Sequence, residues 1–466
     1  MLKFCKYNQE NVIRQITNGT FDNVSSSQEN LVDNIILSMY DNGILECLED
    51  AMDDKRKGSM LPFDLIMALS IAAKMKLKMS ISDISYAIQD HRVLAKLGYN
   101  IVDTEGKLKK NLMNEGVMRN FLRKYTANEL FSAYNDGVQQ YIMPKIKAAP
   151  TIHLLDCTDL YVNFDNKNYE GAEVTKNKYG DVSRGYKLGT IRGIVEDTGI
   201  IEEICFGGLK THDLNLVKDM IMNSKVFKPG NTLIADRGFL DRELINFMKN
   251  EREVDFYIPL RENMIAYETA VSLAISDNKW EPHPTRENQK IAFVPNLKEY
   301  WWSDHVKANK KYAKNDDVEI NSCVVWNTEE NSYFIFVTTD TNKTAKQIIQ
   351  TYELRPEIEE DYRQLKDYWL LDDFKSTKLN MIAFHIITIL FGYLFFQIFT
   401  MLPEGEEYSH KCLPVILKNY QPQSLPYLVF YVDDEFGIFN FIELAKIYAT
   451  CEERVKKKLD SIYEKT

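Results

Sequence analysis

The stretch Tyr352-Glu-Leu-Arg355-Pro-Glu-Ile-Glu359-Glu-Asp-Tyr-Arg-Gln-Leu-Lys366 sets a tyrosine, an arginine, a glutamate and a lysine at intervals of three, four and seven residues. On an α-helix with 3.6 residues per turn, these intervals return to nearly one face. Pro356 belongs in the first turn of a helix, so Tyr352 and Arg355 are expected in a kinked entry turn. A carboxylate flanked by two cations suits a site that holds a divalent metal beside phosphate oxygens.

Acidic neighbours crowd around Glu359, so a solvated helix face is the competing interpretation of this stretch. If Glu359 ligates a metal, partner carboxylates should stand upstream on strands. Asp156 is the first candidate, because it lies in the predicted strand Ile152-His-Leu-Leu-Asp-Cys-Thr-Asp-Leu-Tyr-Val162, where an unpaired charge would be costly. Asp159 is its local competitor and lies on the opposite face of the strand by alternation.

Asp236 is the second candidate, because it ends the apolar run Thr232-Leu-Ile-Ala-Asp236. Ligands gather where strands meet loops in α/β sheets, although an ordinary turn residue is the alternative. The surrounding pattern predicts three strands, a helix, a strand, a helix and a strand. These elements are expected at residues 152–162, 189–196, 200–206, 213–223, 232–236, 241–250 and 255–260.

Residues 62–98 predict two helices that are separated by a turn ahead of Ser80-Ile-Ser-Asp83. This pattern suits a DNA-binding helix-turn-helix and equally a plain helical hairpin, and both interpretations stay open. Residues 381–402 are apolar over a length that could span a bilayer. They include His385 and Gln397, which favours a buried core helix over a membrane span.

The chain has 466 residues and a formal net charge of −11, which does not favour broad contact with nucleic-acid phosphates. Basic runs at residues 55–57, 107–110 and 307–314 either supply local contacts of this kind or are solvated faces. The seven cysteines form no CxxC pair, which argues against a disulfide framework and fits a reducing cytoplasm. No secretory signal is visible at the N-terminus.

Three blocks of this sequence together resemble the DDE transposases of bacterial insertion sequences, which have a ribonuclease H-like catalytic core. The segments Asp156-x-Thr158 and Ala235-Asp236-Arg237-Gly238 match the first and second aspartate blocks of that family. One subgroup carries a Tyr-x2-Arg-x3-Glu-x6-Lys signature, which is matched without a gap by Tyr352, Arg355, Glu359 and Lys366. The resemblance covers about residues 60–402.

The resemblance implies an α/β fold, with a ribonuclease H-like mixed sheet flanked by helices. A helical N-terminal region for binding DNA ends is expected at residues 1–148, and a helical tail that contributes to dimerisation at 403–466. The core is expected in two parts, 149–261 and 341–402, separated by a β-rich insertion at 262–340. The second part carries the helix of the catalytic glutamate.

The resemblance also implies a set of site residues. Asp156, Asp236 and Glu359 would be catalytic and would bind two Mg²⁺ ions, which Mn²⁺ could replace. The DNA contacts implied or considered are Tyr352, Arg355, Lys366, Arg184, Lys187 and Trp302. The first three would contact phosphates near the scissile bond. Arg184 and Lys187 lie in a predicted basic loop, which either approaches DNA or is simply solvated. Trp302 would either stack on a flipped base or be an ordinary core aromatic.

The predicted function is that of a cut-and-paste DNA transposase, an enzyme that cleaves transposon ends and transfers the strands into target DNA. Its expected partners are double-stranded DNA with terminal inverted repeats, target DNA and a second copy of the chain, but no membrane. The expected location is the bacterial cytoplasm. Two alternatives are a catalytically inactive DNA-binding descendant and a ribonuclease H-like nuclease without transposition.

Overall fold

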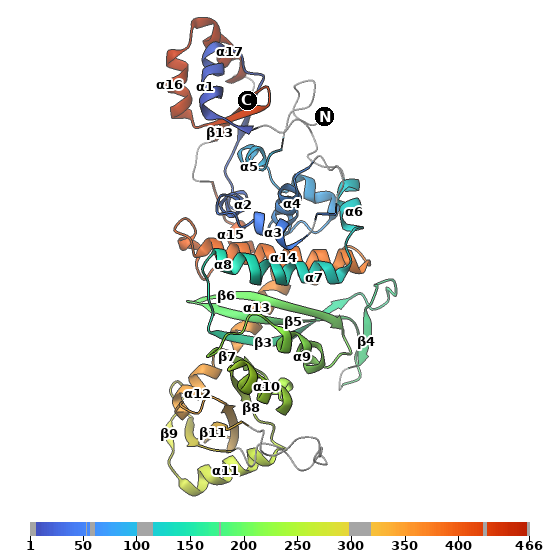
Figure 1. The fold of residues 1–466 in the computed structure, drawn as a ribbon, viewed down its shortest axis with the longest axis vertical. Coiled ribbons are helices and arrows are strands. Elements are labelled where there is room, and N and C mark those ends of the chain that lie inside the picture. Colours follow the sequence, from blue (N-terminus) through green and yellow to red (C-terminus); the bar gives the residue numbers. More distant parts are fainter. Residues whose placement is uncertain are drawn as a thin grey trace. The chain divides into compact units, whose positions relative to one another are not determined.

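The computed structural model describes residues 6–52, 54–55, 61–99, 115–176, 179–297, 318–422 and 426–463. The chain forms two compact units (Figure 1). Unit 1 contains Met1–Ile146, Asn168–Glu170 and Leu365–Thr466, and unit 2 contains Lys147–Lys167 and Gly171–Gln364. The apolar segment after residue 378 therefore groups with the N-terminal helices, whereas the predicted division assigned it to the second part of the core.

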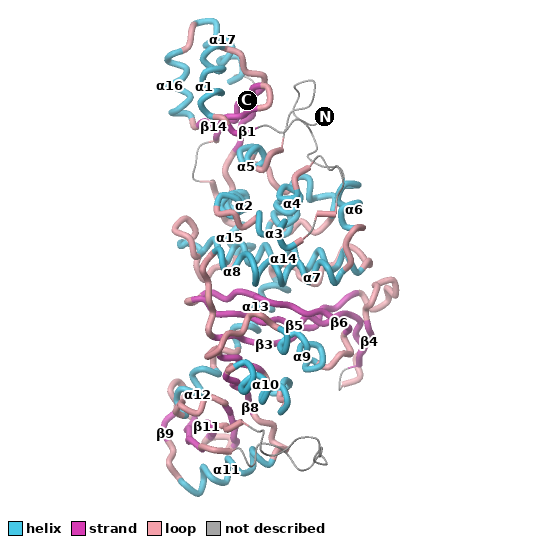
Figure 2. The backbone as a smooth tube through the Cα atoms, in the orientation of Figure 1, coloured by secondary structure: helices cyan, strands magenta, loops and turns pink. Residues whose placement is uncertain are grey.

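Unit 2 is built on a ten-stranded mixed sheet (Figure 2, strands in magenta). Its strands are β3 (Ile152–Val162), β4 (Glu173–Lys176), β5 (Val182–Val195), β6 (Thr198–Gly208), β7 (Thr232–Ala235), β8 (Asp255–Pro259), β9 (Glu281–Pro282), β10 (Gln289–Val294), β11 (Asn321–Asn327) and β12 (Ser332–Thr338). Its helices are α9 (Asp213–Asn223), α10 (Arg242–Arg252), α11 (Ile265–Asp277), α12 (Ala345–Tyr352) and the greater part of α13 (Pro356–Asp367).

The strand pairing confirms the predicted α/β fold class. Strands β6, β5 and β3 are antiparallel neighbours, and β3, β7 and β8 follow as parallel neighbours. This mixed sheet with flanking helices is consistent with a ribonuclease H-like transposase fold. The β-rich segment does not form a separate sheet, because β12 pairs with β8 and extends the core sheet through β11 and β10.

Each face of this sheet packs against its own set of helices. Leu155, Ile191 and Leu233 belong to one buried cluster, which includes apolar side chains of α9, α10 and α11. Leu154 and Ile234 belong to the other cluster, together with residues of α12 and α13. Because side chains alternate along a strand, the odd-numbered residues of β3 face α9, α10 and α11, and the even-numbered residues face α12 and α13. Asp156 is even-numbered, so it shares the face of Leu154, on which α12 and α13 pack.

Unit 1 contains most of the remaining helices and a small sheet. Its helices include α1 (Gln9–Asn18), α2 (Leu31–Asp41), α3 (Glu46–Ala51), α4 (Phe63–Met75), α5 (His91–Lys96), α6 (Glu115–Leu122), α7 (Ala127–Asp136), α8 (Met143–Lys145), α14 (Leu379–Thr400), α15 (Leu413–Leu417), α16 (Phe441–Thr450) and α17 (Glu453–Tyr463). Its strands are β1 (Lys6–Tyr7), β2 (Asn23–Ser27), β13 (Tyr427–Val432) and β14 (Glu435–Phe439).

The long apolar helix α14 is the core helix of unit 1. It has the length and composition of a membrane span, but 94% of its most apolar window is buried inside the protein. Helices α2, α4, α6 and α7 pack around it. His385 is accommodated by two contacts, since Nδ1 lies 3.3 Å from Lys74 Nζ and Nε2 lies 3.2 Å from the Leu371 carbonyl oxygen. Burial lowers the pKa of His385 to about 3, so the neutral ring accepts from Lys74 and donates to that carbonyl.

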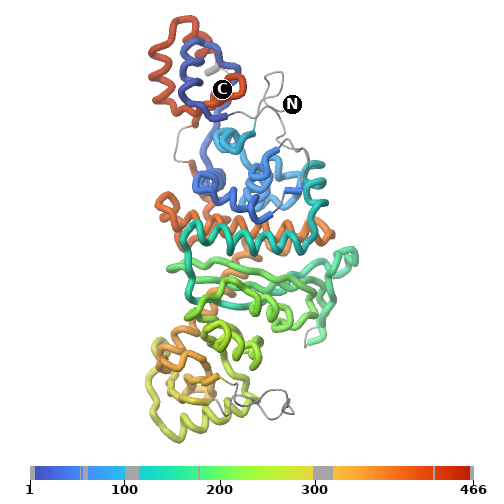
Figure 3. Tube along the Cα trace, in the orientation of Figure 1, coloured from blue at the N-terminus to red at the C-terminus, as the bar shows by residue number. Residues whose placement is uncertain are grey.

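The two ends of the chain meet in a four-stranded sheet, which the sequence analysis did not predict. The strand order is β1-β14-β13-β2, so N-terminal strands form both edges around the C-terminal hairpin. Figure 3 shows these blue and red segments side by side. Helices α1, α16 and α17 bury Val12, Leu444 and Leu459 against it. The C-terminal tail is therefore helical only in part, because residues 427–439 form this hairpin.

The segment predicted as a helix-turn-helix or helical hairpin has one regular helix, α4, and a short one, α5. A 3₁₀ helix, Ile81–Tyr86, lies between them. Ser80 caps the start of this 3₁₀ helix, because its hydroxyl oxygen accepts from the Ser82 backbone N–H at 3.4 Å. A six-residue α5 is shorter than the predicted second helix.

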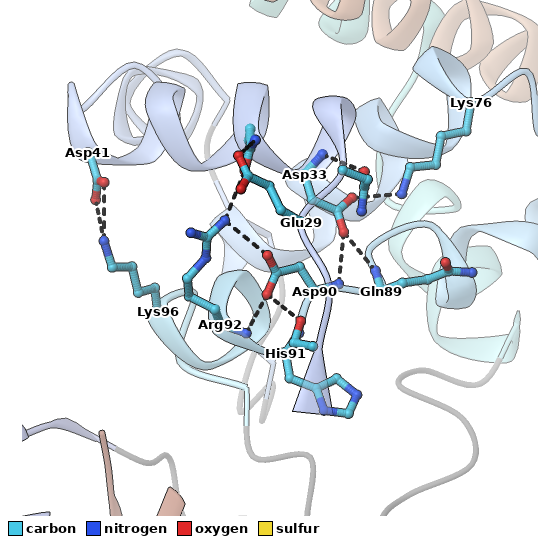
Figure 4. A network of polar contacts seen from close by, with 12 residues as sticks. Glu29, Asp33, Asp41, Lys76, Gln89, Asp90, His91, Arg92 and Lys96 are labelled. Atoms are coloured by element: carbon cyan, nitrogen blue, oxygen red, sulfur yellow. Dashed lines mark hydrogen bonds and ion pairs between the residues drawn. The ribbon is translucent and has the colours of Figure 1, made fainter. Parts of the chain in front are cut away.

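A network of buried carboxylates connects β2, α2 and α5 (Figure 4). Asp33 is fully buried and accepts from Lys76 Nζ at 2.7 Å and from the backbone N–H groups of Gln89 and Asp90. Asp90 is also fully buried and accepts from the Ser27 hydroxyl at 2.6 Å. The donors compensate for the desolvation of these charges and hold the segment before α5 in place.

We expect Asp33→Ala to lower the free energy of unfolding by about 2–4 kcal/mol, because it leaves buried donors without their acceptor. Asp41→Ala is the matched control, since Asp41 pairs with Lys96 at a side chain that is 49% exposed. It should change stability by less than about 0.5 kcal/mol. Urea denaturation of both variants measures the difference, and equal losses would contradict the role of the Asp33 network.

Candidate active site

Two of the three predicted carboxylates lie side by side on neighbouring parallel strands, Asp156 within β3 and Asp236 directly after the end of β7. Leu155 of β3 is the register partner of Ala235 of β7, and Asp156 and Asp236 are the next residue on each strand. Asp156 is mostly buried, with 15% of its side chain exposed, whereas that of Asp236 is 42% exposed. Asp236 also caps the turn that follows β7, because it accepts from the Arg237 backbone N–H at 2.5 Å.

The third carboxylate, Glu359, approaches from α13. Helix α12 ends at Tyr352 and α13 begins at Pro356, with a turn at residues 353–355 between them. The helix is thus interrupted where Pro356 predicted it, so Tyr352 and Arg355 precede the helix that carries Glu359 and Lys366. The Glu359 side chain is 55% exposed.

Arg355 brings the three carboxylates together. Its Nη2 atom lies 3.1 Å from Asp156 Oδ2 and 3.7 Å from Asp236 Oδ2. Its Nη1 atom forms an ion pair with Glu359 Oε1. One guanidinium therefore contacts acidic side chains from two strands and a helix. The structure places all three predicted carboxylates around a single cation.

The charges of this cluster influence one another. Burial is the main cause that raises the pKa of Asp156, Arg355 opposes it, and Asp236 and Glu359 add to it, so that the net pKa is about 6. Burial lowers the pKa of Arg355, but the three carboxylates raise it by more, so its net pKa lies above the ordinary value. The guanidinium is therefore charged, and Asp156 exchanges its proton closer to neutrality than an exposed aspartate does.

Tyr362 holds α13 against the strand that carries Asp156. Its hydroxyl donates to the Asp156 carbonyl oxygen at 2.8 Å and lies 2.7 Å from the Thr190 hydroxyl. Thr190 is the register partner of Asp156 on β5. Tyr362 comes three residues after Glu359, so it lies on a neighbouring position of the same helix surface. This contact sets the position of Glu359 relative to Asp156.

A second anchor of α13 is the buried ion pair between Arg192 and Asp361. Arg192 Nε donates to Asp361 Oδ2 at 2.5 Å, and Arg192 Nη1 donates to Glu357 Oε2 at 2.8 Å. Both Arg192 and Asp361 are buried. The guanidinium lies over Gly199 of β6, where a Cβ atom would overlap it. Glycine at position 199 therefore makes room for the arginine that fixes the helix.

Tyr352 lies beside the cluster with its ring against Phe336 of β12, at 4.5 Å between centroids. Burial raises the pKa of Tyr352 to about 12, so its hydroxyl keeps its proton at neutral pH. Lys366 lies in the last turn of α13.

The weaker DNA-contact candidates do not join the carboxylate cluster. Arg184 is six residues from Thr190 along β5, which corresponds to about 20 Å in a strand. Its Nε donates to the Phe164 carbonyl oxygen at 3.1 Å. Lys187 lies on the opposite face of the sheet from Asp156 and pairs with Asp213 at the start of α9. Trp302 lies outside the described residues, so its predicted role stays a prediction.

A comparison with protein families finds a match over residues 173–395 to the model described as "Transposase DDE domain". This chain resembles the DDE transposases. The matched residues include Asp236 and Glu359, whereas Asp156 precedes them. A search of curated proteins finds no match to the chain. A transposase DDE domain supports a DNA-acting enzyme of the transposase and nuclease class, and such enzymes generally depend on divalent metal ions.

The donor set of the DDE-like domain suits such a metal. Three carboxylates from rigid elements supply the hard oxygen ligands that Mg²⁺ prefers. Among the residues that the structure describes, no three His, Cys, Asp or Glu side chains already converge on one metal position. The Arg355 guanidinium contacts all three carboxylates instead. The three carboxylates therefore suit a metal by their chemistry, and the Arg355 guanidinium lies between them.

Sequence reasoning identified the three carboxylates but missed the residues that position α13. Asp361 was counted among the charges of a solvated helix face, yet it is buried against Arg192. The available signal was Arg192 itself, a charged residue inside the apolar strand Gly189-Thr-Ile-Arg-Gly-Ile-Val195. A buried arginine requires a carboxylate partner, but the strand does not specify which one.

The pKa of Asp156 predicts a specific pH dependence of stability. An aspartate in the unfolded chain titrates near pH 4, whereas Asp156 in the folded protein titrates near pH 6. The folded state binds more protons between these values, so the stabilising contribution is full below pH 4 and is lost as pH rises to 6. Relative to Asp156→Asn, the wild type should lose about 3 kcal/mol across this window in metal-free denaturation experiments. A constant difference between the two proteins would refute the raised pKa.

The anchor of α13 can be tested by a double-mutant cycle. Arg192→Met and Asp361→Asn should each lower the free energy of unfolding by about 3 kcal/mol, because each removes one member of a buried ion pair. The double variant should be more stable than the sum of the two losses predicts. Additive losses would show that the two side chains do not stabilise each other.

Proposed function

We propose that this protein is the DNA transposase of an insertion sequence, which cleaves transposon ends and transfers them into target DNA by a cut-and-paste route. The observation that carries the proposal is the meeting of Asp156, Asp236 and Glu359 around Arg355. These acidic side chains come from separate elements and share one small region. Such convergence is expected of a metal-dependent phosphoryl-transfer site and not of a solvated helix face.

Asp156, Asp236 and Glu359 would hold two Mg²⁺ ions, or Mn²⁺ in their place. When bound, the metal activates water or a DNA 3′-hydroxyl and stabilises the leaving oxygen. The chain's own contribution is to fix the ligands on rigid elements, because β3, β7 and α13 are held together by the contacts of Tyr362 and Arg192.

DNA phosphates near the scissile bond would be bound by the cationic and hydroxyl groups of Arg355, Lys366 and Tyr352. The planar Arg355 guanidinium can grip a phosphate with two N–H groups, and Lys366 acts as a point charge. Arg184 and Lys187 are proposed as more distant phosphate contacts. For Lys187 this requires exchange of its pair with Asp213 for a phosphate. Trp302 is proposed as a stacking platform for a base.

The proposed partners are double-stranded DNA with terminal inverted repeats, target DNA and a second copy of the chain in a homodimer. We assign end recognition to residues 1–148 and a contribution to dimerisation to residues 403–466. The proposed location is the bacterial cytoplasm, where chromosomal and plasmid DNA are present.

Two other functions compete with this proposal. A catalytically inactive DNA-binding descendant has no need of three carboxylates gathered at one place, so their arrangement favours an active enzyme. A nuclease without transposition would use the same carboxylates. A transposase differs from such a nuclease because it recognises the transposon ends in order and then joins them to a second DNA.

We expect Asp236→Asn and Glu359→Gln each to reduce cleavage at the element's ends by at least about 1,000-fold, because each removes a proposed metal-binding charge. Gel-shift assays should show that binding to the ends persists. Cleavage is followed on DNA that carries both inverted repeats, with Mg²⁺ and with EDTA, and strand transfer with added target plasmid.

Asp159→Asn is the matched control for these variants. It changes a carboxylate on the same strand as Asp156 but on the opposite face, where Asp159 accepts from the Tyr161 hydroxyl at 3.0 Å. Cleavage by this variant should be within about threefold of the wild type. Unchanged cleavage by both Asp236→Asn and Glu359→Gln would contradict the assignment of the active site. Cleavage without any joined product would favour the nuclease.

A further inference from the structure

Arg355 occupies the centre of the carboxylate cluster. The ion-pair contacts use Asp156 Oδ2, Asp236 Oδ2 and Glu359 Oε1, one oxygen of each acidic side chain. Asp156 Oδ1 and Asp236 Oδ1 accept backbone N–H groups of their own chain neighbours. The oxygens that face the guanidinium are therefore the ones left over for a metal.

An arginine and a divalent ion cannot occupy the position between these oxygens at the same time. Mg²⁺ holds its oxygen ligands at roughly 2.0–2.1 Å and excludes a guanidinium from the same position. The positive charge of Arg355 would also repel an ion bound beside it. Metal binding to all three carboxylates thus requires the guanidinium to move away.

The surroundings of Arg355 provide for such a movement. It lies in the turn between α12 and α13, so its side chain can change direction without breaking a helix. It also lines a cavity of about 390 Å³. Gln289 and Glu353 line the same cavity and offer oxygen acceptors, and Tyr352 and Phe336 offer aromatic rings. These groups suit a guanidinium.

Two unsatisfied polar atoms indicate that the Arg355 side chain has a second possible arrangement. Within the described residues, Arg355 Nε is buried without a hydrogen-bond partner, and so is Gln289 Oε1. A donor and an acceptor on the walls of one cavity are each left unpaired, which costs free energy in both cases. Movement of Arg355 into the cavity would bring the two kinds of group together.

We infer that Arg355 is a displaceable counter-ion that competes with the divalent metal for Asp156, Asp236 and Glu359. The inference rests on the proposed function and adds a means of regulation to it. Without DNA, the guanidinium lowers the affinity of the site for metal. A DNA phosphate that binds Arg355 removes it from the carboxylates and raises that affinity, and by linkage the metal raises the affinity for DNA. The free protein thereby holds the metal weakly until DNA is bound.

The test measures Mn²⁺ binding to the full chain without DNA, by the electron paramagnetic resonance signal of free Mn²⁺. Arg355→Gln should bind Mn²⁺ at least about tenfold more tightly than the wild type, because it removes a competing positive charge. Arg355→Lys, which retains the charge, should lie between the two. Arg286→Gln is the matched control: Arg286 lines the same cavity but pairs with Glu353, and its loss should leave Mn²⁺ affinity unchanged.

Two further measurements separate the possible failures. Adding Asp236→Asn should weaken Mn²⁺ binding in both the wild-type and the Arg355→Gln background. Mn²⁺ should raise the midpoint of thermal unfolding more for Arg355→Gln than for the wild type, which also shows that the variant is folded. Equal Mn²⁺ affinities, both weakened by Asp236→Asn, would overturn the counter-ion role and leave the metal site standing. Binding insensitive to Asp236→Asn in both backgrounds would overturn the metal site itself.

Discussion

The attachment of α13 to the sheet is the constraint on which the candidate site depends. Glu359 is largely exposed, and Arg355 is the neighbour with which it forms an ion pair. Its position is set further along the helix, where Tyr362 bonds to the main chain of Asp156 itself. A contact to the backbone of Asp156 couples the helix to the strand more directly than a contact between two mobile side chains would. The buried pair of Arg192 and Asp361 fixes the neighbouring helical position.

The same site shows why a cluster of like charges needs an internal cation. Three carboxylates within reach of one guanidinium would repel one another in its absence, and burial would favour protonation of Asp156. Arg355 therefore stabilises the folded protein in the state without metal. The same interaction opposes metal binding, so stability and activity make different demands on one residue. A turn ahead of Pro356, beside a cavity, is a suitable place for such a residue.

Unit 1 uses buried polar groups in another way. Asp33 and Asp90 accept backbone and side-chain donors around α5, and Lys74 and His385 satisfy each other within an apolar core. Each of these groups is paired by residues far away in the sequence. Such pairs specify one arrangement of helices, because alternative packings of the apolar α14 would leave charges buried without partners.

The local pattern of the sequence was sufficient for most elements of unit 2. Strand β3 and helix α9 occur at the predicted residues. Alternation and helical periodicity depend on a few neighbouring residues, so they can be recognised in a single chain. The three carboxylates were found because their blocks resemble a family. The small sheet of β1, β14, β13 and β2 was not predicted, because its strands are short and its two N-terminal strands pair with the C-terminal hairpin across at least 400 residues.

What the sequence by itself determined is the order of most strands and helices of unit 2, the three candidate acidic residues and the break before Pro356. What only the tertiary structure decided is the partner of each charge. Arg192 lies 169 residues from Asp361, and Arg355 lies 199 residues from Asp156. Ion pairs of this kind depend on which strand lies beneath which helix, and that is settled by packing of the whole sheet. For this reason the sequence indicated a carboxylate site, whereas the arginine at its centre became visible only in the folded chain.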